Sequence, residues 1–223
     1  MPGITRYGYR DAISGFFEFP TDNARRILPR GLEPVEPHHG TSILAVTVFD
    51  FDESEVGPYG EVVYAVVVPP YVSEGKPLPK SAMFPWQVAT TTRMAREHAV
   101  ERWHLPHWMD DVAIAFDRQP GRTTARVRAE GAPALEMTIT DHSWAPVSHL
   151  YQSFQKDDSG TYLCNIMFEG EKSEHEEEAG SVVLHDSSFN KDVVISEVYE
   201  RPFRELWMRN GCQLFDPLLR LPR

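Results

Sequence analysis

Turn residues divide this chain into many short segments, and their spacing limits the fold more than any other feature. Eighteen prolines and fourteen glycines separate short runs of β-branched and aromatic residues. Such runs favour strands, and the residues between them favour turns. The sequence therefore predicts a mainly β protein. The expected strands lie near residues 13–19, 41–51, 61–69, 83–91, 111–118, 122–130, 133–140, 161–169, 180–186 and 193–200.

Short helices interrupt this pattern. The first is expected from about residue 22 to 28, where Pro29 ends it, and the second from about 92 to 104, before Pro106. A third helix, near residues 203–209, has a weaker signal. The mainly β fold is therefore expected to carry two or three short helices.

The segment 169–178 is rich in glutamate. Like charges at this density repel one another and need water around them. We expect a solvated loop between two strands here, rather than a binding site for a cation or a partner.

Length and charge limit the domain count and the partners. A chain of 223 residues with 41% hydrophobic content can bury a substantial core, and no long linker divides it. We therefore expect one domain over residues 1–223. The 33 acidic and 22 basic residues give a net charge of -11, which repels nucleic acid and anionic lipid. Neither nucleic acid nor a membrane is an expected partner.

The sequence also bears on location. No apolar run approaches the ~20 residues of a membrane span, and the first residues lack the basic-then-apolar order of a signal peptide. Cys164 and Cys212 lie far apart and have no metal-binding spacing. We expect a cytoplasmic, reduced protein, with one disulfide as the alternative.

A turn at residues 57–61 places the carboxylate of Glu61 at the start of the apolar segment 62–68. A glutamate there lies at a mouth of the core or inside it, where desolvation raises its pKa and suits it to acid or base catalysis. Its alternative role is to cap the strand in water. Tyr59, two residues earlier, lies on the same side of an extended chain and could donate a hydrogen bond to a substrate oxygen. It could equally be a packed turn aromatic.

The helix near 92–104 supplies two more candidates for catalysis. His98 lies beside the apolar face of this helix and can exchange protons near neutral pH. Arg96 could hold a carboxylate or an enolate through its planar guanidinium group. The alternatives are a partly buried structural histidine and an arginine paired with a surface glutamate.

Other chemistry has little support in this sequence. His104, His107 and the two aspartates at 110–111 lie close together, but Pro106 breaks the helix that would fix ligand geometry. No serine nucleophile elbow, cysteine nucleophile motif or glycine-rich phosphate loop is present. We therefore expect no metal and no cofactor.

Several short motifs share an order along the chain. They are residues 16–22, 23–29, 31–34, 46–51, 57–61, 180–185 and 193–198. Together they resemble the acetoacetate decarboxylase family over most of the chain. The resemblance implies a β-barrel, or curved antiparallel sheets, around a largely apolar pocket. It also implies a homo-oligomer with a small carbonyl compound as its substrate.

The resemblance also implies which residues surround the pocket. It makes Glu61 a substrate-orienting glutamate, and it makes the helix near 92–104 a wall of the pocket. Glu61, Trp86 and the face of the helix from Met94 to Trp103 should then border one cavity. The residues expected to contact the substrate are Tyr59, Trp86, Met94, Glu101 and Arg102.

One departure from the family pattern bears directly on mechanism. The decarboxylases carry a Lys-Lys pair between an Arg-Glu on a helix and a following aromatic-Pro, and one lysine forms a Schiff base. The matching segment 96–106 keeps the Arg-Glu and the proline but contains no lysine. An arginine cannot replace it, because its guanidinium offers no free amine. Among the five lysines, only Lys80 is placed where it could face a pocket.

These observations predict an enzyme that acts on a β-keto acid or a polyketide-like intermediate without a Schiff base. Acid/base chemistry through an enolate is common to a lyase, cyclase, dehydratase or isomerase, and the sequence leaves these open. The alternative is a non-catalytic small-molecule-binding protein that has lost decarboxylase activity.

Overall fold

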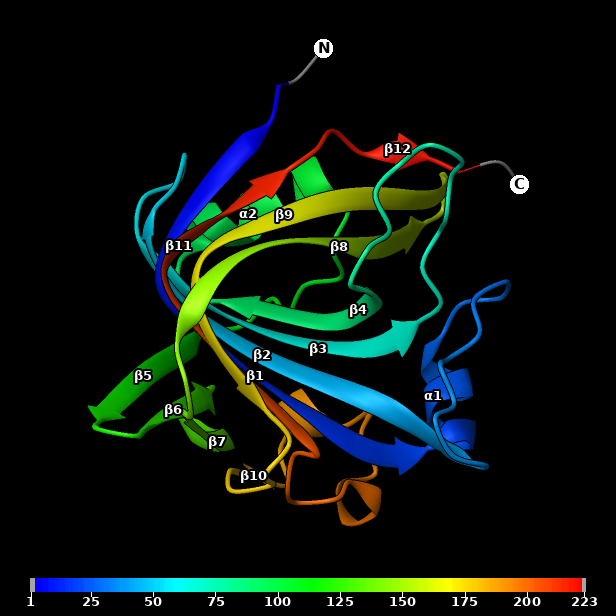
Figure 1. Ribbon diagram of the computed structural model, residues 1–223. Coiled ribbons are helices and arrows are strands. Elements are labelled where there is room, and N and C mark those ends of the chain that lie inside the picture. Colours follow the sequence, from blue (N-terminus) through cyan, green and yellow to red (C-terminus); the bar gives the residue numbers. More distant parts are fainter. Residues whose placement is uncertain (1–2, 222–223) are drawn as a thin grey trace.

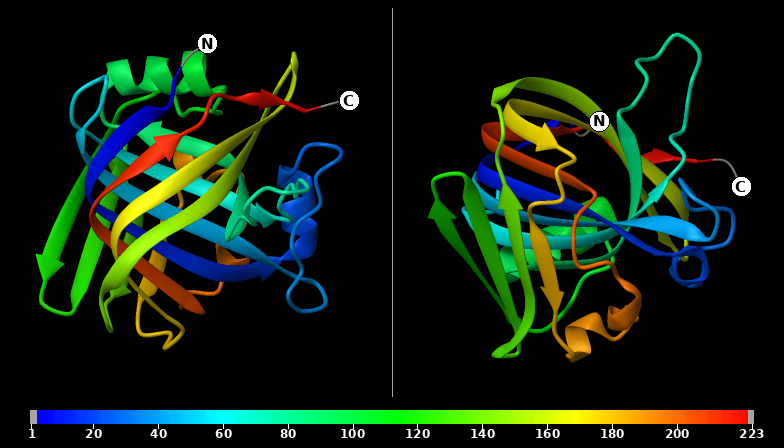
Figure 2. Two further views of the ribbon diagram at one scale, coloured as in Figure 1. Left: turned by 45° about the horizontal axis from the view of Figure 1, so that its top comes forward. Right: turned by 60° about the horizontal axis from the view of Figure 1, so that its bottom comes forward.

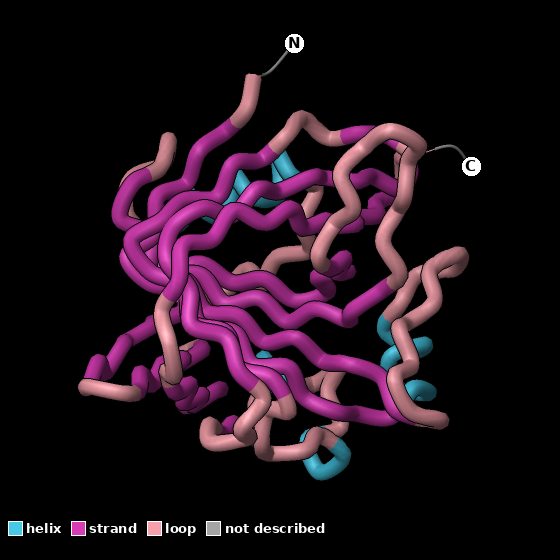
Figure 3. Tube along the Cα trace, in the orientation of Figure 1, coloured by secondary structure: helices cyan, strands magenta, loops and turns pink. Residues whose placement is uncertain are grey.

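The computed structural model describes residues 3–221, and strands dominate it (Figures 1 and 3). Two α-helices are present, α1 (Thr21–Ile27) and α2 (Arg93–Trp103), with short 3-10 turns η1 (Ser188–Asn190) and η2 (Ile195–Glu197). The strands are β1 (Thr5–Pro20), β2 (Thr41–Glu53), β3 (Tyr59–Val68), β4 (Ser81–Thr90), β5 (Val112–Gln119), β6 (Arg122–Ala129), β7 (Ala132–Thr140), β8 (Ala145–Asp157), β9 (Gly160–His175), β10 (Ser181–Leu184), β11 (Arg204–Phe215) and β12 (Leu219–Arg220).

Seven strands close into a barrel (Figure 1). Their order is β11-β1-β2-β3-β4-β8-β9, and the pairing of β9 with β11 closes the ring. All neighbours run antiparallel except β4 and β8, which are parallel. Closure leaves few free sheet edges, since every barrel strand has two partners. The mainly β, barrel-type fold predicted from the sequence is confirmed.

A second sheet, in the order β10-β7-β6-β5, packs on the outside of the barrel (Figure 2). Successive side chains of a strand point to opposite faces, so each barrel strand contributes to two cores. Ile13 and Phe17 of β1 point outward and pack with Met137 and Ile139 of the second sheet. Phe16 points inward, into the core inside the barrel.

Helix α2 crosses one end of the barrel (Figure 2). Thr92 caps it, because its hydroxyl accepts a hydrogen bond from the Ala95 N–H at 3.2 Å. The helix ends at His104, whose φ of 52° is left-handed. Ala95, Ala99 and Trp103 form its buried face, which lies toward the barrel interior. No helix within residues 3–221 is long and apolar enough to cross a membrane.

The two convincing helices and most of the expected strands are present, but four predictions of local structure are wrong. The segment expected as a helix near 203–209 lies in strand β11, and β8 was not expected at all. Residues 193–200 form no strand, because their buried side chain, Val198, packs on the core from a bent segment around η2. The predicted loop at 169–178 continues strand β9 as far as His175. In each case pairing or packing with distant segments overrides local preference.

Candidate active site

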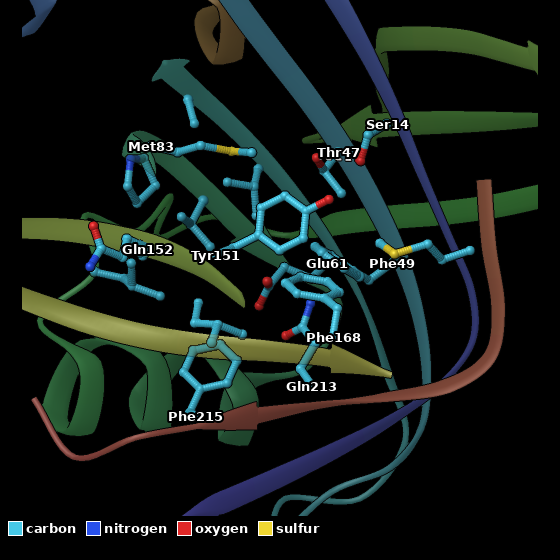
Figure 4. Close-up of a pocket in the computed structure, with 18 of the residues that line it drawn as sticks. Ser14, Thr47, Phe49, Glu61, Met83, Tyr151, Gln152, Phe168, Gln213 and Phe215 are labelled. Atoms are coloured by element: carbon cyan, nitrogen blue, oxygen red, sulfur yellow. Dashed lines mark hydrogen bonds between the residues drawn. The ribbon is translucent and has the colours of Figure 1, made fainter. Parts of the chain in front are cut away.

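A largely apolar cavity occupies the barrel interior (Figure 4). About 790 Å³ is free of protein atoms, including the open space at its mouth. Aliphatic and aromatic side chains form most of the wall, as in most small-molecule sites. The polar wall residues are Ser14, Thr47, Glu61, Tyr151, Gln152, Ser153, Gln155 and Gln213.

Glu61 carries the only acidic group of this wall. It lies opposite Phe49 of β2 and Thr90 of β4, near the start of β3, so its side chain points into the barrel. The side chain keeps some accessible surface because it faces the cavity, but protein atoms surround it. Within residues 3–221 no ion pair or hydrogen bond holds its carboxylate. Burial raises the pKa of Glu61 from 4.5 to about 8.

Two further polar groups point into the same part of the cavity. Figure 4 shows the Gln213 carboxamide and the Tyr151 ring beside the Glu61 carboxylate. Gln213 comes from β11 and Tyr151 from β8. Burial raises the pKa of Tyr151 far above neutrality, so its hydroxyl remains a donor. The Glu61 carboxylate therefore shares a largely apolar cavity with the Gln213 carboxamide and the Tyr151 hydroxyl.

A smaller cavity lies between Glu61 and helix α2, with about 300 Å³ free of protein atoms when the open space at its mouth is included. Glu61 and Gln213 line both cavities and thus separate them. His98 of α2 lines the smaller one, and its Nε2 lies 2.6 Å from the Tyr7 hydroxyl. The Trp103 indole N–H donates to the same hydroxyl, also at 2.6 Å. Burial lowers the pKa of His98, and a neutral ring can accept a hydrogen bond from the Tyr7 hydroxyl.

Tyr59 also borders the smaller cavity. It is buried, and its ring centroid lies 4.8 Å from that of Phe51. Burial, followed by the nearby charge of Glu61, raises the pKa of Tyr59. The structure therefore brings Glu61, Tyr59 and His98 together, as the sequence predicted, around the smaller cavity.

The structure does not bring the other helix residues to either cavity. Arg96 donates to the backbone carbonyls of Met109 and Asp110, the second at 3.1 Å. Met94 is 61% exposed, and Glu101 is also exposed. The buried face of α2 is narrow, since only Ala95, Ala99 and Trp103 form it, and it leaves these side chains outside. Their predicted placement at the pocket is wrong.

Two more predicted contacts are absent from the cavity walls. Arg102 donates to the Thr5 hydroxyl at 2.5 Å, and its guanidinium lies over the Trp103 ring. Trp86 points outward from β4 and packs edge-on against Tyr64, with ring centroids 6.0 Å apart. The expectation that Trp86 borders the cavity with Glu61 is wrong, because the strand alternation turns it to the outer core.

None of the five lysines, all within the described chain, belongs to the wall of either cavity. The Lys80 ammonium group instead contacts Glu174, with N–O distances of 2.5 and 2.7 Å. Across residues 3–221, no three His, Cys, Asp or Glu side chains are grouped so that they could hold a metal ion.

No family model matches this sequence, and no curated protein matches it. Solved structures do match. One, from structural studies of acetoacetate decarboxylase, has a TM-score of 0.68 at 12% identity, over 99% of this chain and 90% of that chain. This chain has the acetoacetate decarboxylase fold. The resemblance drawn from the short motifs is thus confirmed at the level of the fold.

Two further structures share the acetoacetate decarboxylase fold with this chain. The acetoacetate decarboxylase of Legionella pneumophila has a TM-score of 0.64 at 13% identity, covering 100% of this chain and 90% of that one. The enduracididine biosynthesis enzyme MppR, complexed with pyruvate, has a TM-score of 0.63 at 12% identity, covering 100% and 91%. Both are enzymes, and at this identity the likeness establishes the fold.

Sequence reasoning missed three groups that the acetoacetate decarboxylase fold brings to Glu61, namely Tyr7, Tyr151 and Gln213. Tyr151 lies in β8, which was not expected, and Gln213 in β11, where a helix was expected. Tyr7 lies in the part of β1 before the predicted strand. A short apolar run at Leu206, Trp207 and Met208 was the available signal for β11.

Proposed function

We propose that this chain is an enzyme that transfers protons to and from a small carbonyl compound through an enolate, without a Schiff base. One observation carries the proposal: within residues 3–221 the Glu61 carboxylate has no partner, it faces an apolar cavity, and burial raises its pKa to about 8. A group that titrates near neutral pH is suited to both giving and taking a proton. The similar structures, including an enzyme complexed with pyruvate, support a small carbonyl substrate.

The proposed step begins with the Glu61 carboxylate removing a proton from the carbon beside the substrate carbonyl. The C–H electron pair moves into a new carbon–carbon double bond, and the carbonyl electrons move to oxygen. The Gln213 amide, drawn beside the Glu61 carboxylate in Figure 4, would donate a hydrogen bond to that oxygen. The apolar wall excludes water and strengthens these interactions.

Protonated Glu61 then returns the proton to the enolate. Delivery to a different carbon isomerises the substrate, and loss of a leaving group or attack on a second carbonyl gives dehydration or cyclisation. Loss of carbon dioxide from a β-keto acid forms the same kind of enolate. The proposal therefore covers a lyase, a cyclase, a dehydratase and an isomerase.

The second candidate is a binding protein that keeps the pocket without the reaction. The apolar wall and the absence of lysine from it favour this alternative. Against it, a binder of apolar molecules gains nothing from a buried carboxylate, which costs free energy to desolvate.

Exchange of the α-hydrogens of small ketones and keto acids in D₂O, followed by NMR, tests the proposal. Glu61→Gln keeps the shape but loses the titratable group, so exchange should fall by ~10²-fold or more. Glu101→Gln, on the exposed side of α2, is the matched control and should exchange like the unmodified protein. Equal exchange rates for the Glu61→Gln variant and the unmodified protein would show that Glu61 is not the acid or base. Ligand binding without exchange in either protein would favour the binding protein.

A further inference from the structure

A second polar cluster lies on the inner surface of the barrel, away from Glu61. In the β9–β11 pairing, Lys172 lies opposite Met208, and Glu174 lies opposite Leu206. Directly paired residues point to the same face of a sheet. Met208 and Leu206 line the cavity, so Lys172 and Glu174 point into the barrel as well.

Two more cations complete this cluster. Arg204 pairs with Phe16, another cavity residue, and its guanidinium lies 5.7 Å from the centre of the Phe16 ring. Arg204 also contacts the Glu174 carboxylate. Lys80 and Lys172 each lie 2.5 Å from an oxygen of the same carboxylate. We call Lys80, Lys172, Glu174 and Arg204 the inner cationic cluster.

Within residues 3–221, the protein does not balance the charge of this cluster. Three cations and one carboxylate leave an excess of two positive charges, on side chains that are only 15–33% exposed. His149 lies opposite Phe168 and so faces the same side. Burial lowers its pKa, so the neutral ring neither adds to the positive charge nor offsets it. Its Nδ1 is buried without a partner. Excess charge in a half-buried site costs free energy that a bound anion would offset.

The inner cationic cluster is connected to the candidate active site by Tyr151. Tyr151 lines the same cavity as Glu61 (Figure 4), and the charges of Glu174 and Arg204 act on its hydroxyl. Among residues 3–221, no lysine or arginine lines either cavity, while the cations of the cluster point into the same barrel. An acid bound at Glu61 itself would meet a carboxylate and an apolar wall.

We propose that the inner cationic cluster binds a carboxylate of the substrate and so directs the substrate carbonyl toward Glu61. This inference rests on the proposed function for the carbonyl end of the substrate. The substrate is then an oxo acid whose carboxylate and reacting carbonyl lie at opposite ends of a short chain. Lysine ammonium groups and an arginine guanidinium are the natural partners of a carboxylate.

Calorimetric binding to Glu61→Gln protein tests this site apart from catalysis. The probes are a series of oxo acids of increasing chain length and their neutral methyl esters. The best acid should bind at least ten-fold more tightly than its ester. Lys172→Met should abolish that preference and leave ester binding unchanged, while Lys172→Arg should keep it. Lys191→Met, at an exposed lysine, is the control and should keep the full preference.

A second variant separates anion binding from a purely structural ion network. Glu174→Gln removes the one negative charge, so the acid should bind several-fold more tightly even if the protein unfolds more easily. Weaker or unchanged acid binding by folded Glu174→Gln protein would overturn the proposal. Inorganic phosphate displacing the acid at lower concentration than acetate would overturn the assignment to a carboxylate. Proton exchange at Glu61 can be absent while the preference for the acid persists, and exchange can persist while that preference is absent. The two proposals can therefore be disproved separately.

Discussion

Two glutamates that point into the same barrel, Glu61 and Glu174, have opposite shifts of their side-chain pKa. Glu61 has no partner in the part of the chain that the structure describes, and burial raises its pKa to about 8. Glu174 is also removed from water, which by itself raises its pKa, but contacts with Lys172, Lys80 and Arg204 lower the pKa to about 2. The comparison shows that cationic partners can keep a partly buried carboxylate of this barrel charged, whereas burial without partners favours the neutral form. One end of the interior is suited to proton transfer and the other to holding charge.

The largest expected effect concerns the pH dependence of exchange at Glu61. If its carboxylate is the base, the rate should rise about ten-fold per pH unit up to about pH 8 and then level off. Between pH 6 and pH 8 this amounts to about 50-fold, because half of the groups are ionised at the pKa. NMR-monitored α-hydrogen exchange across pH 5–10 measures the profile. A profile with no inflection between pH 7 and pH 9 would contradict the raised pKa of Glu61 and its role as the base.

Glu174→Gln should lower the free energy of unfolding at pH 7 by about 2 kcal/mol, because it leaves three cations without a carboxylate. That figure allows for partial exposure of the group. The folded-state pKa of Glu174 lies below its unfolded value of 4.5, so its contribution is present above pH 4.5 and is lost as the pH falls toward 2. Urea unfolding at pH 7, 4 and 3 should therefore show the variant and the unmodified protein converging. A difference in unfolding free energy that stays the same at all three pH values would show that the charge of Glu174 does not stabilise the fold.

Glu61→Gln should have the opposite pH dependence. The folded-state pKa of Glu61 lies above its unfolded value of 4.5, so the folded protein loses stability as the pH rises from 4.5 through about 8. Removing the group should raise the free energy of unfolding by about 1 kcal/mol or more at pH 9 and by little at pH 4. Thermal unfolding at the two pH values measures the difference. Equal gains at both would mean that packing, not charge, is responsible.

Met94→Ala should have the smallest effect. Its side chain is exposed and touches neither cavity, so stability should change by less than about 0.5 kcal/mol and exchange should be unaltered. Exchange and urea unfolding, measured beside Glu61→Gln, check this. A loss of exchange comparable to that of Glu61→Gln would show that α2 contributes its outer face to the site after all.

The sequence by itself determined the local features of this protein. Prolines and glycines divided it into strands, and the turn at 57–61 placed Glu61 at the head of an apolar strand that could only lie in a core. Helix α2 was also predictable, because Thr92 caps it and Pro106 limits it. These features depend on neighbours within a few residues, so local pattern is enough to find them.

Only the tertiary structure decided what surrounds Glu61. Gln213 and Tyr151 lie in β11 and β8, whose mixed sequences form strands because β1, β4 and β9 pair with them. Closure of the barrel also turns part of the acidic segment inward as the end of β9. There Glu174 contacts Lys80 and Arg204, two cations that lie far from it in the sequence. Backbone pairing between segments up to about 200 residues apart supplies the hydrogen bonds and the partners that local sequence cannot specify.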